Sequence, residues 1–298
     1  MNETIIEGVI AAVPTPFLDD GTPDLERFID HCRWAFANGA DGLNVLGTTG
    51  EANSQNTKAR KQIMKAAAEN LDPAKLMVGT ATPDLETTVE LTRYASDLGY
   101  PVALVLPPYY YKPVTDNGLF GWFEDLDRRL GSSSIELYLY NFPALTGIGF
   151  PLDLIARLAK ELKGRVTGIK DSSADLPYCR DIVEKIPGFK VFPSSETCLG
   201  AARSDGFAGC ISASVNVTAP LAQKLWQASA GTADAETLQS IVSLRTQIAS
   251  VPLIAAVKYL ISQREKSPQW EAVRLPQETL NNNQKDALSE AASRLGYV

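Results

Sequence analysis

The stretch VIAAVPTPF at residues 9–17 decides between two α/β architectures. It begins as a short apolar strand, as either architecture would. An open, doubly wound sheet that binds a dinucleotide usually continues from its first strand into a glycine-rich GxGxxG turn. Here the strand runs into Pro14, Thr15 and Pro16 instead, which disfavours the open sheet.

Seven further apolar runs follow this one along the chain, with starts spaced by roughly 20 to 35 residues, the length of one strand–helix unit. Most of them lack alternation between apolar and polar residues, which is typical of a parallel sheet covered on both faces. Eight such strands predict an α/β fold, the (β/α)8 TIM barrel. The predicted strands are residues 9–13, 42–46, 76–79, 102–106, 136–140, 166–169, 190–192 and 209–212.

Amphipathic stretches between the strands predict helices. Residues 25–38 carry apolar side chains close to a 3.6-residue period, and residues 152–162 repeat the pattern. After Ser212 no further strand is evident, and residues 233–251 and 252–263 are expected to be helical. No Gly/Ser-rich or Pro-rich linker divides the chain, so we expect one structural unit: a barrel with additional C-terminal helices packed on it. The two parts are residues 1–225 and 226–298.

Composition excludes several classes of function. Over 298 residues, 45% are apolar and 21% charged, as in an ordinary globular chain, so disorder is not the main state. The net charge of −7 repels phosphate backbones, which argues against a nucleic-acid partner. The chain has neither a signal-peptide pattern at its start nor an apolar run of about 18 residues. We therefore expect a cytoplasmic protein with no membrane partner.

Histidine and cysteine usage restricts the chemistry further. His31 is the only histidine, so no triad or zinc site rich in histidine can be built without it. We expect it to be structural, on the outer face of its helix. The four cysteines form no CxxC pair and are interpreted as reduced, apolar packing residues: Cys32, Cys179, Cys198 and Cys210. Because no Asp, Glu or His cluster has metal-ligand spacing, we predict no metal.

The active site of a (β/α)8 barrel lies at the C-terminal ends of its strands. The second predicted strand runs into GTTGE at residues 47–51. Backbone N–H groups from Gly47 onward, with the hydroxyls of Thr48 and Thr49, could hold a carboxylate there. The alternative is an ordinary tight turn and helix N-cap, because Thr and Gly are common in both.

Lys170 closes the sixth predicted strand, and Tyr140 closes the fifth. Desolvation in a barrel mouth favours a neutral amine that can attack a carbonyl, and a phenol connected to a second hydroxyl can relay protons. The alternatives are a surface lysine and a core or rim tyrosine.

Three loops supply weaker candidates. Residues 109–111 are three consecutive tyrosines between prolines, which cannot all be buried in one core, so at least one ring should meet another subunit or a ligand. The hydroxyls of Ser195, Ser212 and Ser214 and the carboxylate of Glu196 could hydrogen-bond a substrate tail, or could simply cap local structure.

Four fragments taken together, in this order and spacing, resemble the dihydrodipicolinate synthase / N-acetylneuraminate lyase family of class I aldolases. The likeness runs over residues 9–214, about two-thirds of the chain. The resemblance implies a (β/α)8 barrel with C-terminal helices, a homotetramer built as a dimer of dimers, and no cofactor. The fragments are GTTGE at 47–51, PYYYKP at 108–113, YNFP at 140–143 and GIKDSS at 168–173.

The resemblance also implies a role for each matching residue. Lys170 would form the Schiff base with pyruvate or another 2-oxo acid, and Tyr140 would relay protons. Thr48 and Thr49 would hold the pyruvate carboxylate, with Thr48 also joining a hydroxyl relay. Tyr110 would reach into that relay from a neighbouring subunit.

Substrate choice separates the branches of this family. Leu145 stands where dihydrodipicolinate synthases usually have an arginine that grips the second carboxylate of aspartate semialdehyde. The stretch PALTG at residues 143–147 resembles the N-acetylneuraminate lyase branch, in which the positions of Glu196 and Ser212 contact a polyol tail. Ser195 replaces that branch's usual aspartate, which argues against neuraminate itself. Around residues 51–60 and 83–87 the polar residues of a lysine-feedback site are not evident.

Several functions remain open at this point. The leading hypothesis is a pyruvate-dependent lyase or aldolase that acts on a 2-oxo-3-deoxy sugar acid or a related hydroxylated 2-oxo acid, with pyruvate and an aldehyde as its small-molecule partners. The alternatives are dihydrodipicolinate synthase, a dehydratase on a keto-deoxy acid, and, from another class, a non-catalytic barrel that only binds a small acid. The last would have no need of an amine at Lys170.

Overall fold

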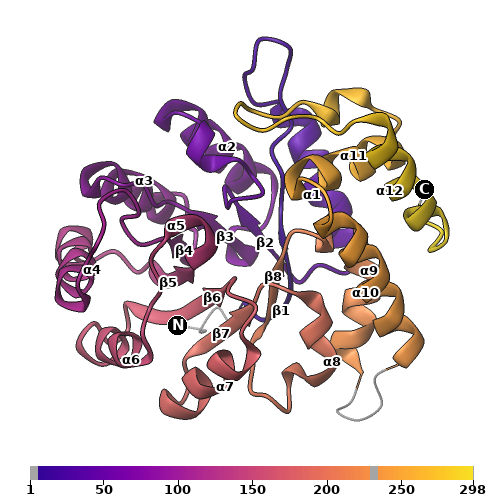
Figure 1. The fold of residues 1–298 in the computed structure, drawn as a ribbon. Coiled ribbons are helices and arrows are strands. Elements are labelled where there is room, and N and C mark those ends of the chain that lie inside the picture. The colour runs from indigo at the N-terminus through magenta and orange to yellow at the C-terminus, as the bar shows by residue number, and fades with distance from the viewer. Residues whose placement is uncertain (1–5, 229–233, 298) are drawn as a thin grey trace.

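The computed structural model describes residues 6–228 and 234–297, and its centre is a parallel sheet curled into a barrel (Figure 1). The strand order is β7-β6-β5-β4-β3-β2-β1-β8, and a hydrogen bond from the Ala208 N–H to the Val191 oxygen (2.9 Å) links the two ends. The predicted (β/α)8 fold is confirmed. Its strands are β1 Gly8–Ala12, β2 Gly42–Val45, β3 Leu76–Gly79, β4 Val102–Val105, β5 Glu136–Asn141, β6 Val166–Asp171, β7 Lys190–Pro193 and β8 Gly209–Ser212.

Helices follow the strands and form the outer ring (Figure 1). Most of the longer ones begin at a side chain that accepts a backbone N–H, such as Asp24 before α1 and Asn56 before α2. The helices around the barrel are α1 Leu25–Ala37, α2 Thr57–Asn70, α3 Leu85–Asp97, α4 Asp116–Leu130, α5 Pro143–Thr146, α6 Leu152–Glu161, α7 Leu176–Lys185, α8 Leu199–Ala202 and α9 Val215–Gln227. Short 3-10 turns lie at Ala52–Ser54, Pro73–Lys75, Glu196–Cys198 and Pro268–Glu271.

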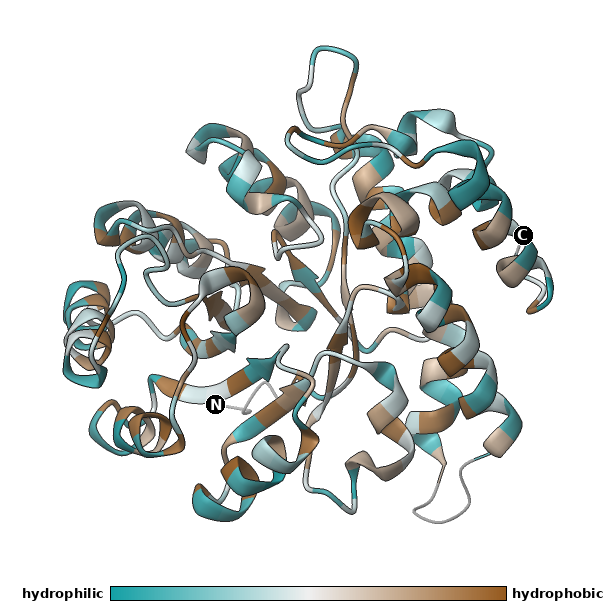
Figure 2. Ribbon diagram, viewed as in Figure 1, coloured by the Kyte–Doolittle hydropathy of each residue, from teal (hydrophilic) through white to brown (hydrophobic). Residues whose placement is uncertain are grey.

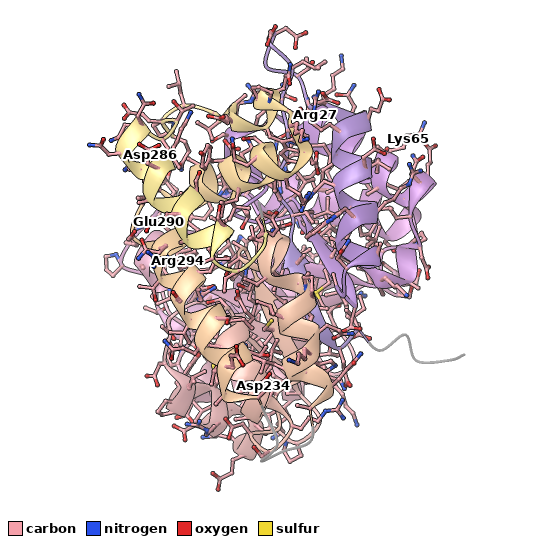
Figure 3. The ribbon with its side chains drawn as sticks, turned by 90° about the vertical axis from the view of Figure 1, so that its right-hand side faces the viewer. Arg27, Lys65, Asp234, Asp286, Glu290 and Arg294 are labelled. Carbon is pink, nitrogen blue, oxygen red and sulfur yellow. The ribbon has the colours of Figure 1, made fainter. Side chains whose placement is uncertain are left out.

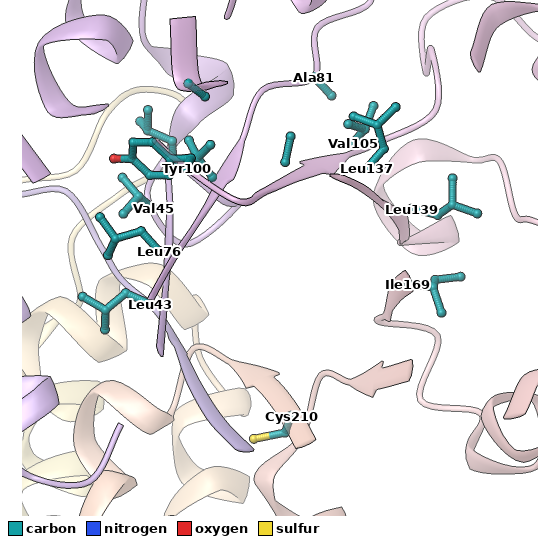
Figure 4. Packing of buried hydrophobic residues seen from close by; sticks show 14 of the residues in the cluster. Leu43, Val45, Leu76, Ala81, Tyr100, Val105, Leu137, Leu139, Ile169 and Cys210 are labelled. Carbon is teal, nitrogen blue, oxygen red and sulfur yellow. The ribbon is translucent and has the colours of Figure 1, made fainter. Parts of the chain in front are cut away.

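Successive strand residues face opposite sides of the barrel wall. Leu137, Leu139 and Ile169 point outward and pack beneath the helices (Figure 4). Tyr138 and Tyr140 point inward, where they join a separate apolar cluster inside the barrel. The strands are accordingly apolar on both faces, whereas polar residues lie on the outer surfaces of the helices (Figure 2). This alternation decides which residues of β5 and β6 can reach the barrel mouth.

The C-terminal helices α10 Ala235–Ala249, α11 Leu253–Glu265 and α12 Asn282–Ser293 pack on one flank of the barrel beside α1 and α9 (Figures 1 and 3). Their core includes Trp270, Leu260 and Ile248, all fully buried. The expected helices are present, although residue 233, where the first was predicted to begin, lies outside the described residues. The division at residue 225 stays a prediction; the barrel's last strand ends at Ser212.

Within the described ranges no single helix is long and apolar enough to cross a membrane; α10 and α11 reach that length only as a pair bent by 116°.

One part of the expectation for His31, that it lies on the outer face of its helix, is wrong. Its side chain is fully buried, its Nε2 donates to the Asn216 Oδ1 at 2.8 Å, and its ring lies against Trp270. The helix face that carries it is covered because the C-terminal helices pack over α1, which helical periodicity within residues 25–38 could not reveal. All four cysteines are free and buried, and burial raises the pKa of each thiol.

Candidate active site

A cavity of about 440 Å³ opens at the C-terminal ends of the strands. Residues from β5, β6 and β8 line it together with residues from α5, α10 and α11. It therefore lies where barrel enzymes carry out their chemistry, and the C-terminal helices provide part of its wall. Within the described parts of the chain, no three His, Cys, Asp or Glu side chains are grouped so that they could hold a metal ion.

Lys170 and Tyr140 meet on the floor of this cavity. They are register partners on β6 and β5, and the Lys170 Nζ lies 3.2 Å from the Tyr140 Oη. Lys170 is only 4% exposed, so the alternative of a surface lysine does not apply. Both side chains point into the barrel because they occupy the same position in the alternation of neighbouring strands. An amine buried among apolar groups beside a phenol can act as a nucleophile with its proton carrier at hand.

Thr48 extends this pair into a chain of three groups. Its Oγ1 lies 3.2 Å from the Tyr140 Oη, and both Thr48 and Thr49 line the cavity. The turn that carries them is held from below, because the Thr15 hydroxyl and the Gln55 amide both donate to the Gly50 oxygen, at 2.8 and 2.7 Å. Thr48 is thus connected to the amine through Tyr140, and the predicted role of the threonine pair at a carboxylate stays a prediction.

Gly47 and Gly79 allow this turn to pack closely. A Cβ on Gly79 would lie 2.1 Å from the Leu46 oxygen, and one on Gly47 would lie 2.5 Å from the Asn44 Nδ2. Only glycine fits at position 79, where the obstacle is backbone, whereas a side chain at position 47 would require the Asn44 side chain to shift. Gly47 also lines a small cavity of about 20 Å³ that it shares with Thr48 and Tyr140.

Asn141 and Asp171 are the next register partners along β5 and β6, and their side chains lie on the opposite face from Lys170 and Tyr140. The Asn141 Nδ2 donates to the Asp171 Oδ1 at 2.7 Å, and both side chains are buried. The Asn141 Oδ1 in turn accepts the Phe150 N–H at 3.2 Å, and the Asp171 Oδ2 accepts from the Ser173 hydroxyl at 2.7 Å. This pair ties together the strand ends that present Lys170 and Tyr140, and the residue patterns alone did not single it out.

Glu196 and Ser212 are buried behind the cavity wall, and their expected contact with a substrate tail stays a prediction. Glu196 is fully buried: its Oε2 accepts from the Ser212 hydroxyl at 2.6 Å and its Oε1 from the Thr218 hydroxyl at 2.9 Å. Arg245, from α10, stands between this carboxylate and the cavity, with its Nη1 3.0 Å from the Glu196 Oε2. The Ser195 hydroxyl is directed to Thr197.

Arg245 is the main cavity residue that the sequence did not indicate. It is held by the Ser214 hydroxyl (2.6 Å) and the Ser194 oxygen (3.1 Å) in addition to Glu196. Burial opposes ionisation of Glu196, but the Arg245 charge and hydrogen bonds from Ser212 and Ser214 outweigh it and hold its pKa below the ordinary value. The residue lies on a helix of the C-terminal extension, and no local pattern in that helix points to the barrel mouth.

The three consecutive tyrosines are divided as expected. Tyr109 is half-buried, whereas Tyr110 and Tyr111 are 72% and 81% exposed. Their rings contact each other edge to face, with centroids 5.2 Å apart. Within this single chain Tyr110 does not join the Tyr140–Thr48 pair, so its predicted role depends on a second copy.

Leu145 lines the cavity from α5 and is 64% exposed. An apolar side chain therefore occupies the position at which the family resemblance places an arginine in dihydrodipicolinate synthases.

An eight-stranded parallel barrel with a buried lysine and tyrosine at its mouth fits the chemistry of a class I aldolase or lyase. The particular family follows from the whole chain: residues 5–295 match the model of the dihydrodipicolinate synthetase family, and the protein belongs to that family.

Individual relatives agree with this assignment. An uncharacterised DapA-like lyase of Chloroflexus aurantiacus is 29% identical over 97% of this chain and 96% of its own. The structure of dihydrodipicolinate synthase from Agrobacterium tumefaciens superposes with a TM-score of 0.89 at 29% identity, covering 97% of this chain and 99% of that one. The Escherichia coli K12 prophage protein YagE, solved in complex with pyruvate, gives 0.90 at 26% identity over 99% and 100%.

Proposed function

We propose that this protein is a Schiff-base-forming lyase that makes or cleaves a carbon–carbon bond between pyruvate and an aldehyde. The observation that carries the proposal is the chain of three groups at the barrel mouth. The Lys170 Nζ lies 3.2 Å from the Tyr140 Oη, which lies 3.2 Å from the Thr48 Oγ1. The similarity to YagE in complex with pyruvate supports pyruvate as the 2-oxo acid.

In the cleavage direction, the Lys170 amine adds to the C2 carbonyl of a 2-oxo acid. The resulting C2 hydroxyl takes the proton of the Tyr140 phenol and leaves as water, which gives a protonated imine beside a tyrosinate. The tyrosinate then removes the proton of the C4 hydroxyl. The C3–C4 electron pair then moves into the imine to form an enamine, and the aldehyde departs. Protonation of C3 and addition of water release pyruvate and regenerate the amine. The hydroxyls of Thr48 and Thr49 hold the carboxylate throughout.

The walls beyond the amine favour a hydroxylated, uncharged tail. Leu145 offers no charge on one side. On the other, Arg245 is already paired with the buried Glu196, so the pair carries little net charge while the guanidinium still has N–H groups to donate. A sugar hydroxyl can accept such a hydrogen bond without needing a counter-charge. We therefore favour a 2-oxo-3-deoxy sugar acid or a related hydroxylated 2-oxo acid.

The second candidate is 4-hydroxy-tetrahydrodipicolinate synthase, which condenses pyruvate with aspartate semialdehyde. The similarity to the Agrobacterium tumefaciens synthase and the GTTGE turn favour it. The apolar Leu145 opposes it, because a substrate carboxylate is bound best by an arginine that can donate two parallel hydrogen bonds to it. Leu145 cannot supply such a group, and Arg245 is already paired with Glu196.

Three measurements test the proposal. Borohydride reduction in the presence of pyruvate should add a pyruvyl-derived mass to Lys170, located by peptide mass spectrometry. An unchanged mass in folded protein would rule out the imine. Coupled assays then compare cleavage of 2-oxo-3-deoxy sugar acids with condensation of pyruvate and aspartate semialdehyde, and faster condensation would reverse our ranking. Product analysis separates cleavage from dehydration, which shares the imine and breaks a different bond.

The homotetramer belongs to the same proposal. Tyr110 is exposed in the single chain and would complete the hydroxyl relay only from a neighbouring subunit. Sedimentation equilibrium of the wild-type protein and of Tyr110→Ala measures the assembly directly. A monomer with full activity would contradict a role for a neighbouring subunit.

A further inference from the structure

Glu51 and Lys258 form a buried ion pair between the turn after β2 and helix α11. The Lys258 Nζ lies 2.5 Å from the Glu51 Oε1, and the two side chains are 0% and 1% exposed. The same ammonium donates to the Ala272 oxygen at 2.5 Å and lies 4.4 Å from the centre of the Phe17 ring. The second carboxylate oxygen of Glu51 accepts the Arg274 N–H at 2.6 Å.

Stability alone does not account for such a pair. Two charges removed from water lose their hydration, and well-packed apolar residues of similar volume often serve stability as well or better. Burial lowers the pKa of Lys258 to about 8, even though the Glu51 carboxylate opposes that shift. The pair does supply a fixed distance and direction between two segments that are 207 residues apart in the chain.

Glu51 lies at the C-terminal end of the turn that carries Thr48 and Thr49, where the backbone is strained. Glu51 has a φ of 55° and Leu46 a φ of 56°, so two non-glycine residues in the left-handed region enclose Thr48 and Thr49. Such conformations persist where surrounding contacts hold them. The Glu51 N–H donates to the Thr48 oxygen at 3.0 Å, which connects the backbone of Glu51 directly to the threonine pair.

We propose that Glu51 and Lys258 are positioning residues through which helix α11 fixes the turn that binds the carboxylate of the 2-oxo acid. The inference rests on the proposed function for the identity of that carboxylate. It goes beyond that function because it gives the C-terminal helices a part in substrate binding. That part is indirect, since the Glu51–Lys258 pair does not touch the substrate.

The test uses Glu51→Gln, Lys258→Met and the double variant. Each single variant buries one unpaired charge and is expected to lose stability, whereas the double variant has no such charge and should regain it. If the pair positions the turn, all three variants need about tenfold more pyruvate for half-maximal borohydride trapping on Lys170. Trapping at saturating pyruvate should stay close to wild type. Lys285→Met, which breaks a different ion pair of the C-terminal helices (2.5 Å to Glu271), should leave both values unchanged.

Two outcomes overturn the inference. If the double variant regains wild-type pyruvate dependence together with its stability, the pair is only structural; if no variant changes that dependence, the turn needs no such support. Amide hydrogen exchange over residues 46–52 gives a readout that does not require catalysis, and faster exchange is expected in the three variants but not in Lys285→Met. Failure of the proposed function gives a different result: wild-type protein would not be trapped by pyruvate, while the exchange difference would persist.

Discussion

Tyr140 and Lys170 are register partners on adjacent parallel strands, with the phenol oxygen 3.2 Å from the amine nitrogen. The same ladder pairs Asn141 with Asp171 on the opposite face. Strand register therefore sets the distance between the two reactive groups, and the hydrogen bond behind them keeps that register at the ends of the strands.

Replacing Lys170 by alanine is expected to abolish both turnover and borohydride trapping, because no other amine lies beside Tyr140 in the described structure. The barrel should remain folded, since the substitution removes a buried amine and leaves no ion-pair partner of Lys170 unpaired in the described structure. Lys190→Ala is the matched control: Lys190 is also a strand lysine, but it pairs at the surface with Glu7. Circular dichroism checks folding, and a pyruvyl mass on another lysine of the Lys170 variant would contradict the assignment.

Tyr140→Phe should lower kcat by about 10²- to 10⁴-fold, because the ring remains in place while the proton carrier is lost. Trapping of pyruvate on Lys170 should continue, more slowly, since the amine is intact. Tyr138→Phe controls for the loss of a buried phenol from the same strand and the same interior cluster. Equal effects of the two substitutions on kcat would mean that the hydroxyl of Tyr140 acts only through packing.

Leu145→Arg should shift specificity toward an acceptor that carries a carboxylate. An arginine at this exposed position of the cavity wall could bind that group through two parallel hydrogen bonds. We expect the ratio of kcat/KM for aspartate semialdehyde to that for a 2-oxo-3-deoxy sugar acid to rise by about tenfold or more. Leu145→Gln, which is polar but uncharged, should not produce the shift; if it does, charge at this position is irrelevant.

Stability should fall on acidification through a site far from the barrel mouth. Burial opposes ionisation of Glu265, but contacts from His31, Arg264 and Trp270 outweigh it and lower its pKa to about 2, from 4.5. The unfolded chain therefore takes up a proton first, so this contribution is complete above about pH 4.5 and is lost as the pH falls toward 2. Burial also lowers the pKa of His31, so its protonation below about pH 6.5 favours unfolding as well.

Urea unfolding from pH 3 to pH 7 measures this effect. Glu265→Gln should be less stable than wild type at pH 7, with a difference that narrows as the pH falls from 4.5. Glu290→Gln, at an exposed carboxylate of α12 (Figure 3), should follow wild type throughout. A constant difference between Glu265→Gln and wild type over this range would show that the Glu265 carboxylate does not titrate as described.

The barrel itself could be predicted because its signals are local. Each apolar run and each amphipathic stretch lies within one strand–helix unit, and the absence of a glycine-rich turn after residues 9–13 could be read directly. The ends of the strands were predicted less well. The strand β6 continues past Ile169 to Asp171, because Lys170 and Asp171 still pair with the backbones of β5 and β7. Lys170, Tyr140, Thr48 and Thr49 could also be named in advance, because each lies at or shortly after the C-terminal end of a predicted strand.

What the sequence determined by itself, then, was the class of fold, its family and the four groups at the barrel mouth. Only the tertiary structure decided what surrounds them. It placed Arg245 in front of Glu196, covered His31 with the C-terminal helices, and joined Glu51 to Lys258. The physical reason is distance along the chain: secondary structure follows from neighbouring residues, whereas the pairing of buried charges and the covering of a helix face depend on segments that meet only when the chain has folded.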